Sequence, residues 1–155
     1  MLYPQSNAAR AVLDLSGVWD FRLHEEDAWQ PIAVPASYND QKADPAFRNH
    51  YGKAWYRTQL TVPAFWQGQR RILRFDAVTH CARVFLEGRL ICEHRGGFLP
   101  FECDVTDLLA PGRSAELLVE VDNIINHHSL PVGNEGAIAF FGSDNPGIPS
   151  VEAGK

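Results

Sequence analysis

Short segments in which hydrophobic and polar residues alternate run through most of this chain. Residues 54–62 and residues 115–123 alternate with a period of two, which is the period of an extended strand with one buried face. Tyr56, Thr58, Leu60 and Val62 fall on one side of the first strand, opposite to Trp55, Arg57, Gln59 and Thr61, and Leu117, Val119 and Val121 share one side of the second. No segment keeps a helical hydrophobic period over three turns. Such a chain buries a core only by pairing its strands, so we expect an all-β fold.

Further strand-like segments are separated by turn residues at short intervals. Glu87-Gly88 makes a tight turn between two of them, which predicts a hairpin. The best helical candidate is a single turn at residues 104–109, with Asp104 or Thr106 as its N-cap. Many short strands with regular turns predict a two-layer jelly roll or β-sandwich. These further strands are expected at residues 17–23, 30–35, 70–78, 82–88 and 89–94.

The composition fits one globular domain and argues against two kinds of partner. The chain has 155 residues, of which 45% are hydrophobic and 21% charged, enough to bury a single core. Its formal net charge is -5 with both signs mixed along the chain, so no basic surface for nucleic acid is expected. No hydrophobic run approaches the roughly 18 to 20 residues that span a bilayer, so no membrane association is expected.

The cysteines and the first residues together predict a cytoplasmic protein. Cys81, Cys92 and Cys103 are odd in number and form no C-x-x-C pair, so reduced thiols are expected rather than a disulfide framework or a zinc site. The opening residues, MLYPQSNAARAVLDLSG, lack the basic head and hydrophobic block of a secretory signal.

No residue pattern predicts a metal, a cofactor or a covalent nucleophile. His127 and His128 are adjacent, so on a strand they point to opposite faces, and the other histidines are scattered. No Gly-rich phosphate motif opens a helix, and no G-x-S-x-G occurs. We therefore expect neither a bound metal nor a cofactor.

A double glycine, Gly96-Gly97, interrupts the strand-like stretch EHRGGFLPFECDVTDLL at residues 93–109. Glycine adopts backbone angles closed to other residues, so the pair predicts a bend by which the chain crosses from one sheet to the other. Phe98 and Phe101 would then turn inward as core. The alternative is a loop that lets a ligand approach the backbone.

The four tryptophans raise the question of stacking on sugar rings. Trp19 lies between Val18 and Phe21, in a pattern that favours core packing. Trp29 and Trp66 stand beside polar or turn residues, so their sequence context leaves both core packing and ligand contact open.

The end of the chain differs in composition from the rest. We expect a domain at residues 1–135 and a Gly/Pro-rich segment at residues 136–155 that leads to domains absent from this chain. Its paired aromatics, Phe140 and Phe141, are the exception, because exposed aromatic pairs are usually docked on something.

Several motifs occur in a fixed order along the chain, and the most specific are RFDAVTH with its following strand and GGFLPFECDVT. The full set is LSGVWDFRL (15–23), IAVPASYNDQ (32–41), YGKAWYRTQLTVP (51–63), LRFDAVTHCARVFLEG (73–88), EHRGGFLPFECDVTDLL (93–109) and LLVEVDN (117–123). Together they resemble the N-terminal domain of β-glucuronidases of glycoside hydrolase family 2. The resemblance implies a galactose-binding-domain-like jelly roll, often called the sugar-binding domain, in which the double glycine is a strand bend.

The resemblance also implies more than this chain contains. Enzymes of this family continue into an immunoglobulin-like sandwich and a (β/α)8 barrel, whose two glutamates act by a retaining mechanism. A chain of 155 residues has no room for a barrel of roughly 250 residues, so no catalytic residue is expected here.

In the family, a loop after the last strands carries Asp-Phe-Phe-Asn and then Gly-Ile-x-Arg, and its aspartate contacts the sugar. The nearest match here is AFFGSDNPGIPSV at residues 139–151, which puts Ala139 in place of the aspartate and Ser150 in place of the arginine. Asp144 lies close by and is the candidate for substrate binding, against a plain loop aspartate.

Three functional hypotheses follow. The chain is the N-terminal portion of a β-glucuronidase-like hydrolase that is inactive alone and meets carbohydrate, a glucuronide, through the full-length enzyme. Alternatively it is a free-standing carbohydrate-binding module, with Trp29, Trp66 or Tyr38 as its aromatic platform, or a structural interaction domain with a degraded site. A face that normally packs on following domains would promote self-association, so a homo-oligomer is expected.

Overall fold

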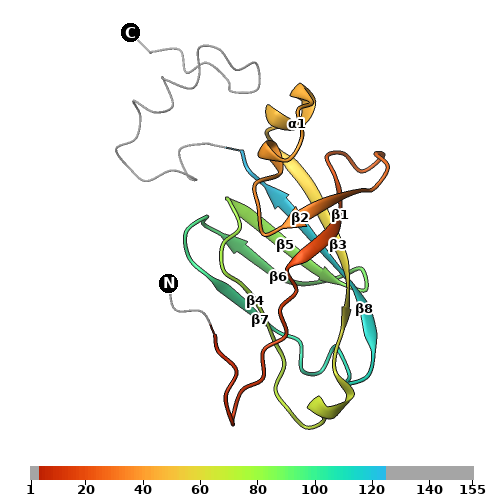
Figure 1. Cartoon of the computed structure of the whole chain (residues 1–155), viewed down its shortest axis with the longest axis vertical. Helices are drawn as coiled ribbons and strands as arrows, with labels where there is room; N and C mark the ends of the chain where they lie inside the picture. The colour runs from red at the N-terminus through yellow and green to blue at the C-terminus, as the bar shows by residue number, and fades with distance from the viewer. Residues whose placement is uncertain (1–3, 125–155) are drawn as a thin grey trace.

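The computed structural model describes residues 4–124, and eight strands are the main regular elements of this part of the chain (Figure 1). Two 3-10 turns and one short helix, η1 (Tyr38–Asp40), η2 (Ala64–Trp66) and α1 (Pro45–Arg48), lie between them. The strands are β1 (Gly17–Arg22), β2 (Gln30–Val34), β3 (Lys53–Thr61), β4 (Ile72–Phe75), β5 (Cys81–Leu86), β6 (Arg89–Arg95), β7 (Phe101–Asp104) and β8 (Ser114–Asp122).

The strands form two antiparallel layers of unequal width. Six strands pair in the order β2-β1-β3-β8-β5-β6, and β4 pairs with β7 in a second sheet. The longest ladder joins β3 to β8 over nine residue pairs, from Lys53 opposite Asp122 to Thr61 opposite Ser114. The expected all-β sandwich of jelly-roll type is confirmed. No helix of residues 4–124 is long and apolar enough to cross a membrane.

The core lies between the two sheets and follows the alternation in the sequence. Phe21, Leu117 and Val84 are its largest fully buried side chains. Of the side chains that share one side of residues 54–62 or of residues 115–123, Leu60, Val62, Leu117, Val119 and Val121 are buried. Tyr56 packs against this core, and Trp19 is buried in it as expected.

The double glycine lies where the chain leaves β6 in the wide sheet and enters β7 in the narrow one, so the predicted crossing is confirmed. Gly96 has a φ of +121°. A Cβ on Gly97 would stand 2.9 Å from the Thr79 hydroxyl oxygen, so this position requires glycine for close packing. Phe101 is half-buried, but Phe98 is 70% exposed and its predicted inward placement is wrong. Phe98 lies in a bend between strands, where no pleat directs it toward the core.

The Glu87-Gly88 hairpin is confirmed, with positive φ at both residues. Asp104 caps the predicted turn by accepting from the Thr106 N–H at 3.0 Å, and the N–H of Leu109 donates to the Val105 carbonyl at 3.0 Å. Helix α1 was not predicted, because four residues are too few to display a helical period.

Cys92 of β6 and Cys103 of β7 form a disulfide with their Cα atoms 6.2 Å apart, and this link joins the two sheets. The expectation of reduced thiols is therefore wrong for this pair, while Cys81 is free. The physical reason is the crossing itself. It turns two strands that are close in sequence toward each other from opposite layers, which the cysteine spacing did not reveal.

Candidate functional site: a groove between the sheets

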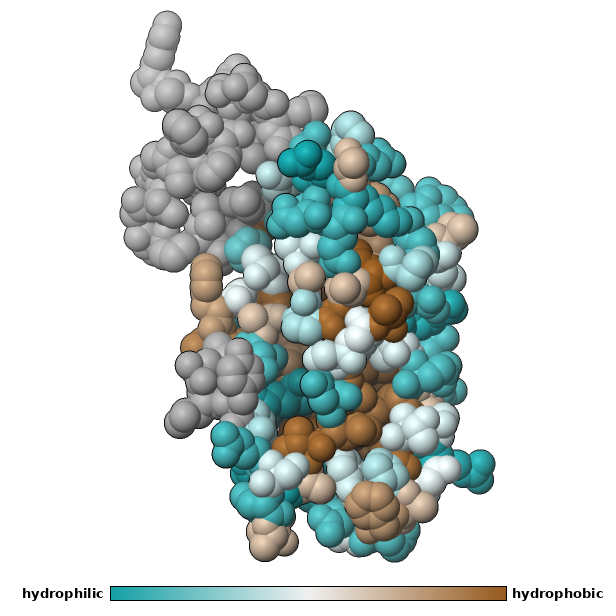
Figure 2. Space-filling view, viewed as in Figure 1, coloured by the Kyte–Doolittle hydropathy of each residue, from teal (hydrophilic) through white to brown (hydrophobic). Residues whose placement is uncertain are grey.

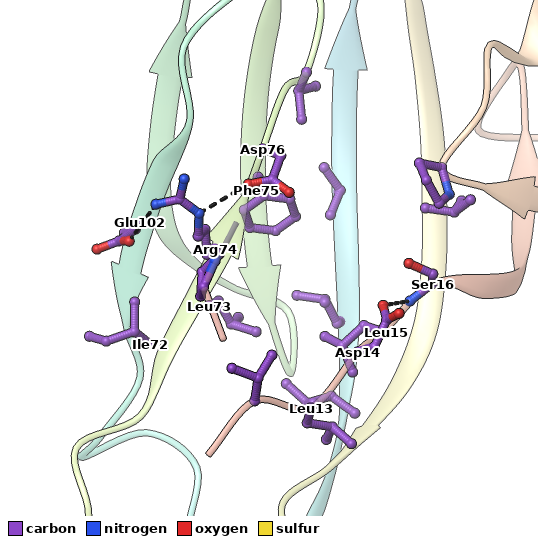
Figure 3. A pocket seen from close by; sticks show the side chains of 18 of the residues that line it. Leu13, Asp14, Leu15, Ser16, Ile72, Leu73, Arg74, Phe75, Asp76 and Glu102 are labelled. Carbon is purple, nitrogen blue, oxygen red and sulfur yellow. Dashed lines mark hydrogen bonds and ion pairs between the residues drawn. The ribbon is translucent and has the colours of Figure 1, made fainter. Parts of the chain in front are cut away.

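A large groove opens where the narrow sheet leaves the inner face of the wide sheet uncovered. It has a volume of about 1420 Å³ and lies between β4 and the N-terminal segment, over side chains of β3 and β8 (Figure 3). Figure 2 shows a band of hydrophobic surface running down this view of the molecule, bordered by hydrophilic residues. Within residues 4–124, two strands of the narrow sheet face six of the wide one, and the groove follows from these unequal layers. Its hydrophobic lining includes Leu13, Leu15, Leu73, Phe75, Leu117 and Val119.

Several charged groups beside the groove have hydrogen-bond partners. The guanidinium of Arg74 donates to Asp76 at 3.0 Å and to Glu102 at 3.0 Å, and these bonds raise the pKa of Arg74 above its usual value (Figure 3). On the opposite wall, Asp14 accepts from the Ser16 N–H at 2.8 Å, and hydrogen bonding to Ser16 lowers the pKa of Asp14. Arg74 and Asp14 are therefore already partnered, and hydrophobic side chains form much of the remaining lining.

A buried arginine stands among the groove residues without an acid partner. Arg71 donates instead to the carbonyls of Gln69, at 2.8 Å, and Thr106. Its Nε and the indole N–H of Trp66 are buried and have no hydrogen-bond partner within residues 4–124. Both residues line the groove, so two unmet donors accompany its hydrophobic surface.

A polar tie holds the point at which the chain leaves β8. The side-chain amide of Asn123 donates to the Tyr38 hydroxyl at 2.7 Å, and its oxygen accepts from the Gly52 N–H at 2.8 Å. The Tyr38 hydroxyl in turn donates to the His50 carbonyl at 3.1 Å. Burial raises the pKa of Tyr38 to about 12, although the hydrogen bond from Asn123 acts in the opposite direction. Tyr38 therefore stays neutral at ordinary pH and serves as a structural link.

The three aromatic side chains considered as alternatives for a sugar platform, Trp29, Trp66 and Tyr38, lie in different environments. Tyr38 is only 6% exposed, and Trp66 is half-buried against the core. The guanidinium groups of Arg22 and Arg57 lie 4.4 Å and 4.2 Å from the ring centroid of Trp29. The Trp29 ring is therefore engaged in cation–π contacts with two neighbouring side chains. Tyr38 and Trp66 line the groove and Trp29 does not. The burial of Tyr38 contradicts its use as an exposed platform, whereas Trp29 and Trp66 stay predictions.

Other candidate residues lie outside the part of the chain that the structure describes. Asp144, the candidate for substrate binding, is one, as are Ala139 and Ser150, and Asp144 stays a prediction. Within residues 4–124, no group of three or more His, Cys, Asp or Glu side chains is arranged to hold a metal ion.

Sequence reasoning missed the two polar features that shape this site. Tyr38 and Asn123 are 85 residues apart, and no spacing rule links them. Arg71 stands in a run, Arg70-Arg71, that reads as solvated charge, yet Arg70 is exposed and Arg71 is buried. The only signal was its position at the start of a predicted strand, where alternation turns one of two neighbours inward.

Comparison with known proteins gives a consistent result. Residues 7–132 match the family described as glycosyl hydrolases family 2, sugar binding domain. The structure of the Faecalibacterium prausnitzii β-glucuronidase is similar at a TM-score of 0.81 and 56% identity, covering 98% of this chain and 28% of that one. A Ruminococcus gnavus β-glucuronidase solved in complex with D-glucuronic acid has a TM-score of 0.78 at 34% identity, covering 84% of this chain and 25% of that one.

A curated β-glucuronidase of Paenibacillus borealis is 38% identical over 146 residues, which cover 86% of this chain and 24% of the relative. The chain thus spans about a quarter of the length of the curated relatives that it matches.

Proposed function

Because this chain belongs to the sugar-binding domain family of glycosyl hydrolases family 2, we propose that it works as the N-terminal domain of a β-glucuronidase. The longer enzyme would hydrolyse glucuronides with retention, using two glutamates of a barrel outside this sequence. The observation that carries the proposal is the match of residues 7–132 to the family, together with similarity to β-glucuronidases over 98% of the chain in one structure.

The role proposed for this part is structural support of the substrate site rather than chemistry. The carboxylates beside the groove are held by Arg74 and Ser16, which leaves them poorly suited to protonate a leaving group or to attack a sugar. The domain would build one wall of the active-site cleft and present the segment that follows β8. Residues 1–135 remain the proposed extent of this domain, with residues 136–155 as its connection.

The test is hydrolysis of an aryl β-D-glucuronide by the purified chain and by a protein extended along the coding frame beyond Lys155. We expect release of the aryl alcohol by the extended protein and none by the chain alone. Hydrolysis by the 155-residue chain would overturn the claim that this domain is not catalytic. An extended protein without glucuronidase activity would overturn the proposal that the domain belongs to a β-glucuronidase.

Asp144 is the proposed sugar contact of the longer enzyme, because it follows the Phe140-Phe141 pair in the segment after the domain. Asp144→Asn in the extended protein should raise KM for the aryl glucuronide. An unchanged KM would remove Asp144 from the site, whereas a loss of folding would show in circular dichroism.

A free-standing carbohydrate-binding module is the weaker alternative, since Tyr38 is buried, Trp66 is half-buried and Trp29 is stacked by two arginines. Titration calorimetry of the chain against glucuronides and plant or host glycans tests it. Binding heat would restore the module, and a flat trace across the panel would end it.

Two further parts of the proposal concern assembly and location. We expect the chain to self-associate, because residues 4–124 leave the hydrophobic groove uncovered, and light scattering that finds a monomer at high concentration would contradict this. A cytoplasmic location also stays a proposal, and the Cys92–Cys103 disulfide is unusual for a reducing compartment. Alkylation of cysteines in intact cells, followed by mass spectrometry, tests the location. In a reducing cytoplasm Cys92 and Cys103 should be alkylated as free thiols, and an intact disulfide would contradict a cytoplasmic location.

A further inference from the structure

Two adjacent hydrophobic side chains stand in solvent at the bend between β6 and β7. Phe98 and Leu99 are each 70% exposed, and neither lines the groove. Single exposed hydrophobic residues are ordinary on a protein surface, but contiguous ones mark a site of contact with another protein surface. We refer to Phe98 and Leu99 as the exposed pair.

The backbone beneath the exposed pair is held in place. Gly97 packs so closely on the β4–β5 connection that a Cβ there would stand 2.9 Å from the Thr79 hydroxyl oxygen and 3.3 Å from the His80 Nδ1. The N–H of Gly96 donates to the His80 carbonyl at 2.7 Å, and Pro100 restricts the backbone that follows. Side chains presented from a fixed backbone lose less conformational freedom on binding, which favours a docking role.

The chain leaves β8 at this same end of the molecule. The N–H of His80 donates to the Asp122 carbonyl at 2.9 Å, which joins the base of the bend to the last residue of β8. Cys81 lies opposite both Arg95 of β6 and Asp122 of β8. Ile124, two residues beyond β8, is a further hydrophobic side chain, 49% exposed. The polypeptide that follows therefore begins close to the exposed pair.

A second exposed phenylalanine lies at the opposite end and gives an internal comparison. Phe65 in η2 is 79% exposed. It follows β3, whose last residue, Thr61, is opposite Ser114, the first residue of β8. The nine residues of β8, roughly 30 Å of strand, thus separate the two ends. A domain attached after β8 meets the exposed pair before it meets Phe65.

We propose that the exposed pair is the anchor by which this domain docks on a hydrophobic surface of the domain that follows it in the same polypeptide. The proposal rests on the proposed function, because it requires the longer protein, and it adds the surface that makes the contact between domains. The attachment after β8 holds the partner nearby, so the contact forms at a high effective concentration.

The test is hydroxyl-radical footprinting with mass spectrometry on the 155-residue chain and on the protein extended beyond Lys155. Phe98 should be oxidised at least about fivefold more slowly in the extended protein, because side chains at the centre of an interface are fully buried. Phe65 should be oxidised at the same rate in both proteins. Equal oxidation of Phe98 in the two proteins, or an equally large decrease at Phe65, would overturn the proposal.

The double variant Phe98→Ser/Leu99→Ser gives an independent measurement. In the extended protein it should lower the thermal midpoint of this domain by at least about 3 °C, whereas the matched control Phe65→Ser should not. In the 155-residue chain it should leave the midpoint unchanged, because both side chains are already in solvent. An equal decrease in the chain alone would mean that the pair supports the fold of its own domain. If the extended double variant does not fold, footprinting of the unaltered proteins decides.

Glucuronidase activity of the same extended preparation separates this proposal from the proposed function. Slower oxidation of Phe98 without activity would support the docking and overturn the proposed function. Activity with unchanged oxidation of Phe98 would do the reverse. Protection of Phe98 that is lost when the extended protein is diluted would also overturn the docking, because the covering surface would then belong to a second copy.

Discussion

The wide and the narrow sheet bury their shared core by different means. The six-stranded sheet relies on long ladders and regular alternation, with β3 and β8 paired over nine residue pairs. The β4–β7 pair has only four residue pairs and is held by links across its surface. These include the Arg74–Glu102 bond at 3.0 Å, the Arg70–Asp104 bond at 2.8 Å and the disulfide to β6. The wide sheet also has cross-strand ion pairs, such as Arg57–Asp20 at 2.8 Å, but the narrow sheet has much shorter ladders to support its own links.

The largest effect is expected in the wide sheet. Leu117→Ala removes one of the fully buried side chains and should lower the free energy of unfolding by about 3 kcal/mol. Urea unfolding measures this, with Leu108→Ala as the control because Leu108 is 39% exposed. A similar loss of unfolding free energy in both variants would mean that the buried side chains of the wide sheet do not contribute more stability than exposed ones.

Removing the covalent link is expected to come next. Cys92→Ala/Cys103→Ala opens a connection between residues 11 apart, and the loss of unfolding free energy should be about 2–3 kcal/mol. The same shift should appear when a reductant is added to the unaltered protein but not to the variant. If reductant changes neither protein, the narrow sheet holds without the disulfide and the contrast between the sheets weakens.

The crossing between the sheets should show a smaller effect. Gly97→Ala places a methyl group 2.9 Å from the Thr79 hydroxyl oxygen and 3.1 Å from its methyl carbon, at an expected cost of about 1–2 kcal/mol. The double variant Gly97→Ala/Thr79→Ala removes both contacts and should recover most of that loss. A double-mutant cycle by urea unfolding measures the coupling, and simple additivity would locate the strain elsewhere.

The smallest effect concerns acid stability. Hydrogen bonds from the side chain of Thr106 and from Arg70 lower the pKa of Asp104 from 3.8 to about 2. A carboxyl group with a depressed folded-state pKa contributes stability that is present above pH about 4 and lost as the pH falls toward 2. Asp104→Asn should therefore flatten the decline of the urea midpoint between pH 4 and 2, and Asp107→Asn is the matched control. A decline of unchanged steepness in Asp104→Asn would exclude this contribution.

The division between the sheets also decides what the sequence could predict. The alternation of residues 54–62 and 115–123 identified β3, β8 and the core side chains they contribute, because a hydrophobic period of two is the side-chain period of a β-strand. The four residues of β7 are too short to show a period, and Phe98 lies in a bend that carries none. The disulfide, the buried Arg71 and the Tyr38–Asn123 bond all depend on how distant segments meet, which the folded topology alone determines.

The hydrogen bonds of Asn123 have a mechanical consequence. Gly52 and Tyr38 hold this residue by hydrogen bonds just after β8 ends. A force applied to the following chain would therefore load these hydrogen bonds first. The force would then be transmitted to the start of β3, where Lys53 is opposite Asp122, and to η1, whose first residue is Tyr38. The polypeptide that follows Asn123 is therefore attached to a residue that hydrogen bonds fix in place. Tension along it would be shared by two elements instead of peeling β8 from its neighbours one bond at a time.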